Sequence, residues 1–341
     1  MSLSDDLQIE NDWLETIVAL PDQMFYNTGI GTFIWIITNR KEEKRKGKIQ
    51  LIDCRDRWLP MKRSLANKRR YLDEEIIDAV TREHGEFTEQ ETSKIFNNDY
   101  FGYRRVTIDR PLRLKFQITD EAKELFLDKY SELEETLLLM ESKLGDKPYL
   151  DWNKVLLKVQ KIFNKAEITW AKGAKGDKQK KFFKDCFTIV DSGAMPVIAN
   201  KGKFGGKVTE SNLPRNEGFP KEFDRQQIDR LFGIYPSSNR KNAKTFIVYE
   251  PDINLRDYEN IPLTQGIVEF FLQEVRPYVE DAWINAEQTD GTDGKIGKVG
   301  YEINFNREFF KYEAPRDLEV INAELAQVEK KILEMLKGIA I

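Results

Sequence analysis

The sequence predicts an α/β fold that begins with strands of a mixed sheet and continues into a mainly helical α+β region. Two observations predict it. Short apolar runs at 17–20, 33–37 and 48–53 indicate strands, and apolar residues spaced by 3 and 4 at 126–144 and 318–339 indicate amphipathic helices. The last of these helices has the narrow apolar seam of the coiled-coil type.

The first strands are rich in β-branched residues and are bounded by Pro21, Gly29 and Gly31. This pattern is typical of strands that are buried on both faces. No helix long enough for a parallel crossover separates the three strands, so we expect the antiparallel edge of a larger sheet that begins upstream of residue 1. Because Gly31 leads into a strand and not into a helix, the glycines predict a turn and no nucleotide-binding loop.

The later part of the chain predicts helices interrupted by short strands. Thr119 caps a helix that continues through 126–144 and ends at Gly145. The Gly/Lys-rich stretch 169–218 is expected to be largely irregular. Further elements are expected as helices around 152–163 and 264–274 and as strands at 187–190, 196–199, 246–249 and 299–305.

Charge is strongly segregated although the net charge is only −4. Residues 40–70 carry a local charge of +9 and residues 165–207 a local charge of +6. Such segregation indicates a polyanionic partner; the alternative is solvated loops that only keep the protein in solution. The second stretch has no Arg, so it either contacts the same partner or contacts nothing. The candidates for contact with a phosphate backbone are Lys44, Arg45, Lys46, Lys62, Arg63, Lys68, Arg69 and Arg70.

Several chemistries are disfavoured by composition. His84 is the only histidine, which argues against a Ser–His–Asp triad or a zinc site that contains histidine. Cys54 and Cys186 match no metal-ligand spacing, so we expect no metal and reduced thiols in the cytoplasm. No run approaches the roughly 18 apolar residues of a membrane span, and no signal peptide precedes the first strand.

Five blocks in order carry a resemblance to a known family. They are ALPDQMFYNTGIGTFIWIITNRK with RKGKIQLIDCRDRW and MKRSLANKRR, then FGYRRVTIDRPLRLKFQIT, LRDYENIPL, VRPYVEDAWIN and VGYEINFNREFFKYEAPR. Together they closely resemble the modification subunit of type I restriction-modification systems, an adenine-N6 DNA methyltransferase. The resemblance implies that the opening strands are the distal, carboxy-terminal part of a methyltransferase-like mixed sheet.

The resemblance also shows a departure from the family pattern. The family binds S-adenosylmethionine through a Gly-rich turn and holds the target adenine with an Asn-Pro-Pro-aromatic loop, whereas this sequence contains no Pro-Pro. We therefore expect the chain to be the distal part of such a subunit, to bind no cofactor alone and to be inactive alone. The alternative is a free-standing, non-catalytic DNA-binding or assembly module. The expected regions are the sheet at 1–60, a connection with a long helix at 61–145, a partly irregular insert at 146–250 and a docking region at 251–341.

The resemblance implies double-stranded DNA, a specificity subunit and a restriction subunit as partners. Phe25 and Tyr26 follow the first strand, where they are candidates for the target-base pocket. The alternative is that Phe25 packs the turn onto the core and Tyr26 is half exposed. The terminal seam either packs on the helix at 119–144 or docks onto the specificity subunit, and it comprises Leu318, Ile321, Leu325, Val328, Ile332 and Met335.

Overall fold

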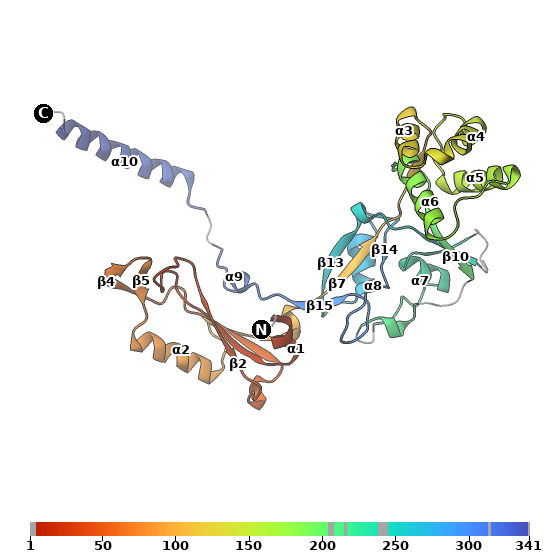
Figure 1. The fold of residues 1–341 in the computed structure, drawn as a ribbon. Coiled ribbons are helices and arrows are strands. Elements are labelled where there is room, and N and C mark those ends of the chain that lie inside the picture. Colours follow the sequence, from red (N-terminus) through yellow and green to blue (C-terminus); the bar gives the residue numbers. More distant parts are fainter. Residues whose placement is uncertain (1–4, 204–207, 215–216, 238–244, 313–314, 340–341) are drawn as a thin grey trace. The chain divides into compact units, whose positions relative to one another are not determined.

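The computed structural model of the protein describes residues 5–203, 208–214, 217–237, 245–312 and 315–339. The chain divides into two compact units (Figure 1). Unit 1 comprises residues 1–11 and 97–302, and unit 2 comprises residues 12–96 and 303–341. The predicted mixed α/β class is confirmed. The four regions expected from the sequence follow chain order and stay a prediction.

Unit 2 is built on a four-stranded sheet in the order β2-β1-β3-β6. The strands are β1 (Leu14–Ala19), β2 (Phe33–Ile37), β3 (Lys48–Asp53) and β6 (Ser93–Asn97). As expected, β2 is antiparallel to β1, but β3 is parallel to β1, so the expectation of three antiparallel strands was wrong. The reason is that β2 returns the chain to the start of β1, and β3 then adds to the opposite side of β1 without a crossover helix.

Burial separates the central strands from the edge strand. β1 and β3 are almost wholly buried, as expected. β2 is the edge of this sheet, and its side chains are half exposed, for example Phe33 at 46% and Ile34 at 48%. The expectation that all three strands are buried on both faces was therefore wrong for β2. The core beside β1 and β3 comprises Val18, Leu20, Ile52 and Cys54, with Leu72, Ile76 and Val80 packed against it.

The remaining elements of unit 2 surround this sheet. A 3-10 helix (Glu43–Arg45) precedes β3, and a hairpin of β4 (Leu59–Leu65) and β5 (Lys68–Tyr71) follows it. Helix α2 (Glu74–Glu86) is capped by Asp73, whose side chain accepts a hydrogen bond from the Ile76 amide. The end of the chain contributes α9 (Phe305–Glu308) and α10 (Leu318–Ile339).

Unit 1 begins with α1 (Asp5–Glu10) and has β7 (Gly102–Asp109) as its central strand. β7 pairs with β13 (Asp257–Pro262), β14 (Trp283–Ile284) and β15 (Lys298–Tyr301), all antiparallel. A second sheet has the order β10 (Ile198–Lys203), β12 (Thr245–Tyr249), β11 (Ile234–Pro236). The other helices are 3-10 helices at Asn98–Phe101, Glu210–Asn212 and Ile253–Leu255, α7 (Arg225–Leu231), α8 (Ile267–Phe270) and the π-helix Phe271–Val275 that continues α8.

Four helices and a two-stranded ladder form a helical subdomain of unit 1. They are α3 (Asp120–Lys129), α4 (Glu134–Leu144), α5 (Trp152–Ala166), α6 (Ala174–Phe187), β8 (Leu114–Phe116) and β9 (Thr188–Val190). Thr119 caps α3, and Gly145 ends α4 with φ +73°. The expectation of one helix over 119–144 was wrong, because Tyr130 leaves the helical conformation and a 3-10 turn (Ser131–Leu133) separates α3 from α4.

The Gly/Lys-rich stretch contains a helix that the sequence analysis missed. Residues 169–218 were expected to be largely irregular, and α6 contradicts this expectation. Phe183 and Phe187 of α6 are 1% and 2% exposed, and they pack against Phe116 and Phe126 in the core of the subdomain. Burial of these aromatic rings stabilises a helix whose exposed residues are mostly lysines.

Candidate nucleic-acid interface

A loop with exposed aromatic residues follows β1 at the carboxyl edge of the sheet. Since β1 and β3 are parallel, with Ala19 opposite Asp53, their carboxyl ends lie at one edge, which is where open α/β sheets bind ligands. The loop is closed by a hydrogen bond from the Leu20 amide to the Thr32 carbonyl (2.8 Å). Phe25 and Tyr26 are 47% and 55% exposed, so neither side chain is buried in the core of the protein.

The basic hairpin β4–β5 holds this loop through backbone hydrogen bonds. The Asn67 amide donates to the Tyr26 carbonyl (3.1 Å), and the Arg69 amide donates to the Gln23 carbonyl (3.0 Å). The Lys68 ammonium lies 5.7 Å from the centre of the Tyr26 ring. The structure therefore brings together two sets of residues that the sequence analysis considered separately, the aromatic pair and the basic residues after 61.

The hairpin presents basic side chains to the solvent. Lys62, Arg63 and Arg69 are exposed and have no acidic partner among the described residues. Arg70 is held in place, because it pairs with Asp22 and its guanidinium lies 3.8 Å over the Trp58 ring. Residues 59–71 contain five basic and no acidic side chains. The hairpin is therefore a compact positive surface beside the aromatic loop.

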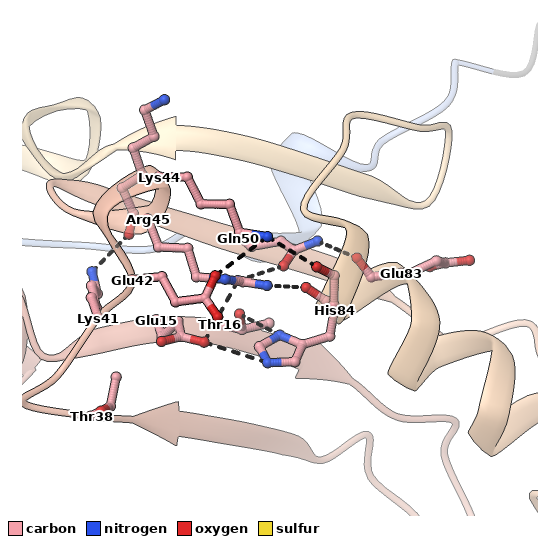
Figure 2. A network of polar contacts seen from close by, with 12 residues as sticks. Glu15, Thr16, Thr38, Lys41, Glu42, Lys44, Arg45, Gln50, Glu83 and His84 are labelled. Carbon is pink, nitrogen blue, oxygen red and sulfur yellow. Dashed lines mark hydrogen bonds and ion pairs between the residues drawn. The ribbon is translucent and has the colours of Figure 1, made fainter.

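Arg45, a candidate for phosphate contact, is instead buried inside unit 2. It is 3% exposed, and its guanidinium donates to the Gln50 Oε1 (3.2 Å) and to the His84 carbonyl (Figure 2). The Glu15 carboxylate lies 3.7 Å from the same group. Arg45 therefore cannot face a phosphate backbone without unfolding this network, and we remove it from the candidate set.

Lys44 and Lys46 are exposed but are close to carboxylates. The Lys44 ammonium lies 3.4 Å from Glu42, and the Lys46 ammonium lies 2.6 Å from Glu43. These neighbours weaken the local positive charge. The hairpin is accordingly the stronger part of the predicted basic surface.

His84 belongs to the same buried network as Arg45 and has no arrangement for catalysis. Its Nδ1 lies 3.1 Å from the Thr16 hydroxyl, and its Nε2 lies 3.4 Å from Glu15 (Figure 2). Burial lowers the pKa of His84, and the nearby positive charge of Arg45 lowers it further. We infer that the ring is neutral at neutral pH and that it ties the end of α2 to β1.

A polar cleft of about 430 Å³ lies at the carboxyl edge of β3 and was not anticipated from the sequence. The Arg55 guanidinium binds the Asp53 carboxylate with both arms (2.8 and 2.7 Å) and donates to the Asn306 Oδ1 (2.7 Å). Burial alone would raise the pKa of Asp53, but the hydrogen bonds from Arg55 lower it. The two blocks that meet here, 45–58 and 299–316, were the available signal.

The apolar seam of α10 is uncovered in the described part of the chain. Leu325, Val328 and Ile332 are 56%, 53% and 49% exposed, and Leu318 and Met335 are more exposed, whereas Ile321 is half buried. The expected alternative partner was the helix at 119–144. Its Phe126, Leu137, Met140 and Leu144 are already buried in the core of the helical subdomain. These residues therefore offer no free apolar seam.

Two searches of the described residues gave negative findings. No described helix is both long enough and apolar enough to cross a membrane. No group of three or more His, Cys, Asp or Glu side chains among the described residues is placed to hold a metal ion.

Comparison with known proteins shows the origin of this surface. The N-6 DNA Methylase family matches residues 6–103, the segment that contains the loop, the hairpin and the Arg45 network. Two methylase subunits of type I restriction enzymes from Methanocaldococcus jannaschii, MjaVIII and MjaIX, are similar to this chain. The first is 29% identical over 99 residues, and the second is 28% identical over 152 residues. The chain is related to the methylase subunits of type I restriction enzymes.

The extent of this relationship to the methylase subunits is limited. The matches cover 27% and 41% of this chain but only 17% and 26% of the length of MjaVIII and MjaIX. The crystal structure of a type I methyltransferase subunit from Streptococcus thermophilus aligns with 28% of this chain and 19% of that chain, with 14% identity and a TM-score of 0.24. This likeness is too slight to support an argument about the fold.

Proposed function

We propose that the chain is the distal part of an adenine-N6 DNA methyltransferase subunit of a type I restriction-modification system, where it contacts DNA. The observation that carries the proposal is the aromatic loop held against the basic hairpin at the carboxyl edge of the sheet. Phosphate contacts from the hairpin would position the duplex. Phe25 or Tyr26 would stack on an adenine that has been rotated out of the helix. Support also comes from the family match over residues 6–103.

Methyl transfer itself is assigned to no residue of this chain. S-adenosylmethionine would need a Gly-rich turn that opens a helix after a strand. Here β1 leads through the loop directly into β2, so the residues present do not fit this cofactor. In the complete subunit, other residues would bind it. The proposed reaction on cellular DNA would place the protein in the cytoplasm.

Neutralising the hairpin tests the DNA contact. The variant Lys62→Gln/Arg63→Gln/Arg69→Gln removes three exposed charges without a partner in the described chain. We expect the slope of log K against log salt for duplex binding to become shallower by about 2 to 3, since each phosphate contact contributes roughly 0.9. The matched control is Lys147→Gln/Lys201→Gln/Lys221→Gln, which changes net charge equally at exposed lysines of unit 1. Equal slopes for the two variants would refute a DNA contact by the hairpin.

Substituting the aromatic pair tests the base pocket. In the complete enzyme, Phe25→Ala and Tyr26→Ala should leave folding intact because both side chains are about half exposed. At least one of them should lower the methylation rate by tenfold or more, in line with about 1–3 kcal/mol for a base stacked on an aromatic ring. An unchanged rate in both variants would remove the stacking role.

A further inference from the structure

We propose that the groove between α4 and α5 is a second DNA-binding site, which contacts the phosphate backbone independently of base sequence. The groove has a volume of about 510 Å³. It is lined by Leu139, Lys143, Leu144, Lys158, Lys161, Ile162, Lys165 and Ala166. α4 and α5 are neighbouring helices of the helical subdomain (Figure 1). The choice of DNA as the occupant rests on the proposed function.

The sequence of α5 explains why lysines line this groove. The buried face of the helix consists of Trp152, Val155, Val159 and Phe163. Lysines recur along another face at 154, 158, 161 and 165, with spacings of 4, 3 and 4. α5 contains no Asp or Glu. The helix therefore carries four positive charges in a row, without the intrahelical ion pairs that would offset their repulsion.

The groove lysines differ from other lysines of unit 1 because no carboxylate neutralises them. Lys143, Lys161 and Lys165 have no acidic partner among the described residues, and the Lys158 ammonium lies over the Tyr149 ring at 4.4 Å. By contrast, Lys123 lies 2.7 Å from Asp120 and 2.8 Å from Glu141. Like charges that converge on an empty groove destabilise the free protein, and an anion in the groove would relieve this repulsion.

The shape and composition of the groove favour a DNA backbone over other anions. From residue 158 to residue 165 the helix rises by about 10 Å. That distance matches about three phosphates of one strand, which follow each other every 3.4 Å or so along a duplex. A hollow admits a rod-shaped duplex, whereas a flat lipid bilayer cannot follow it. The lining contains no aromatic side chain for base stacking, so contact would be with phosphates alone.

The test is duplex binding by the full chain, measured by fluorescence anisotropy over a series of salt concentrations. The variant is Lys158→Gln/Lys161→Gln/Lys165→Gln, and the control is Lys172→Gln/Lys178→Gln/Lys181→Gln, which removes the same charge from exposed positions around α6. We expect the groove variant to bind at least tenfold more weakly near 0.1 M salt and to lose about 2 to 3 from the salt slope, equally for duplexes of different sequence. The control should retain most of the binding.

Further arms make each outcome decisive. The variant Lys158→Arg/Lys161→Arg/Lys165→Arg should bind like the unmodified chain, because charge and not lysine itself is required. Equal losses in the groove and α6 variants would overturn the proposal in favour of a general charge effect. Binding to phosphatidylserine vesicles but not to duplex DNA would also overturn it. If only the hairpin variant loses affinity, the proposed function stands and this inference fails; if only the groove variant does, the hairpin contact fails instead.

Discussion

Arg45 and Arg69 have opposite environments although the sequence places them in the same basic segment. Arg45 is buried beneath the 3-10 helix before β3, where its guanidinium binds Gln50 and lies near Glu15. Arg69 is exposed on the hairpin, and its backbone amide, not its side chain, holds the aromatic loop. One arginine therefore stabilises the fold, and the other is available to a partner.

This contrast predicts different effects of the same substitution. Arg45→Ala should lower the free energy of unfolding by about 2–4 kcal/mol, because it leaves buried polar partners without hydrogen bonds. Arg69→Ala should change stability by less than about 0.5 kcal/mol and should weaken DNA binding instead. Chemical denaturation and anisotropy measure the two effects. The contrast would be refuted if Arg45→Ala proved as stable as the unmodified chain.

The end of α2 is joined to the sheet by a network that senses pH. The Gln50 amide donates to the Glu83 carbonyl (3.0 Å) and to the Ser93 hydroxyl (2.9 Å), and His84 completes the contact with Thr16. Burial holds the pKa of His84 below its ordinary value. The unfolded chain, with a histidine pKa of about 6.5, therefore binds this proton more readily than the folded protein.

Stability should consequently depend on pH through His84. Its contribution is fully present above about pH 6.5 and is lost as the pH falls towards the lowered folded-state pKa. Melting temperatures measured between pH 7.5 and pH 5 should fall less steeply for His84→Gln than for the unmodified chain. Parallel curves for the two proteins would show that His84 titrates normally.

The exposed seam of α10 predicts a partner, and we propose the specificity subunit. Leu325→Asp/Ile332→Asp should abolish co-purification with that subunit, because both residues lie at the centre of the apolar seam. The control Ala323→Asp/Lys330→Asp places the same side chain on the opposite face and should bind normally. Retained association of the seam variant would exclude this role, and loss in both variants would indicate damage to the helix.

Local periodicity in the sequence was enough to predict several elements but not their pairing. β1, β3, α5 and α10 follow from apolar spacing, which reflects short-range geometry. The parallel pairing of β1 with β3 depends on the side of β1 to which β3 adds, and no local pattern carries that information. α6 was missed because its lysines and glycine obscured the buried phenylalanines.

Prediction of the candidate site met a similar limit. Charge counting identified the basic segment, and the position after a strand identified Phe25 and Tyr26. Neither signal revealed that Asn67 and Arg69 hold the loop through their backbone amides, since any residue except proline can donate such a bond. The burial of Arg45 was equally invisible, because it depends on contacts with residues that are distant in the sequence.

The molecule as a whole consists of two units with separate cores, and we propose that it supplies surfaces and not the reaction centre. Calorimetric titration of the full chain with S-adenosylmethionine should therefore show no stoichiometric binding in the micromolar range. Duplex DNA titrated into the same sample should give a measurable heat. Tight uptake of the methyl donor by this chain would contradict the assignment of cofactor binding to the rest of the complete subunit.

The main-chain attachment of the loop to the hairpin has an evolutionary consequence. Because carbonyls of the loop accept bonds from amides of the hairpin, the side chains on both segments can be exchanged without releasing the loop. Homologues are then free to adopt different patterns of charge and aromaticity here while the scaffold stays the same. Such a surface can adapt to new DNA targets, or to new companion subunits, through single substitutions.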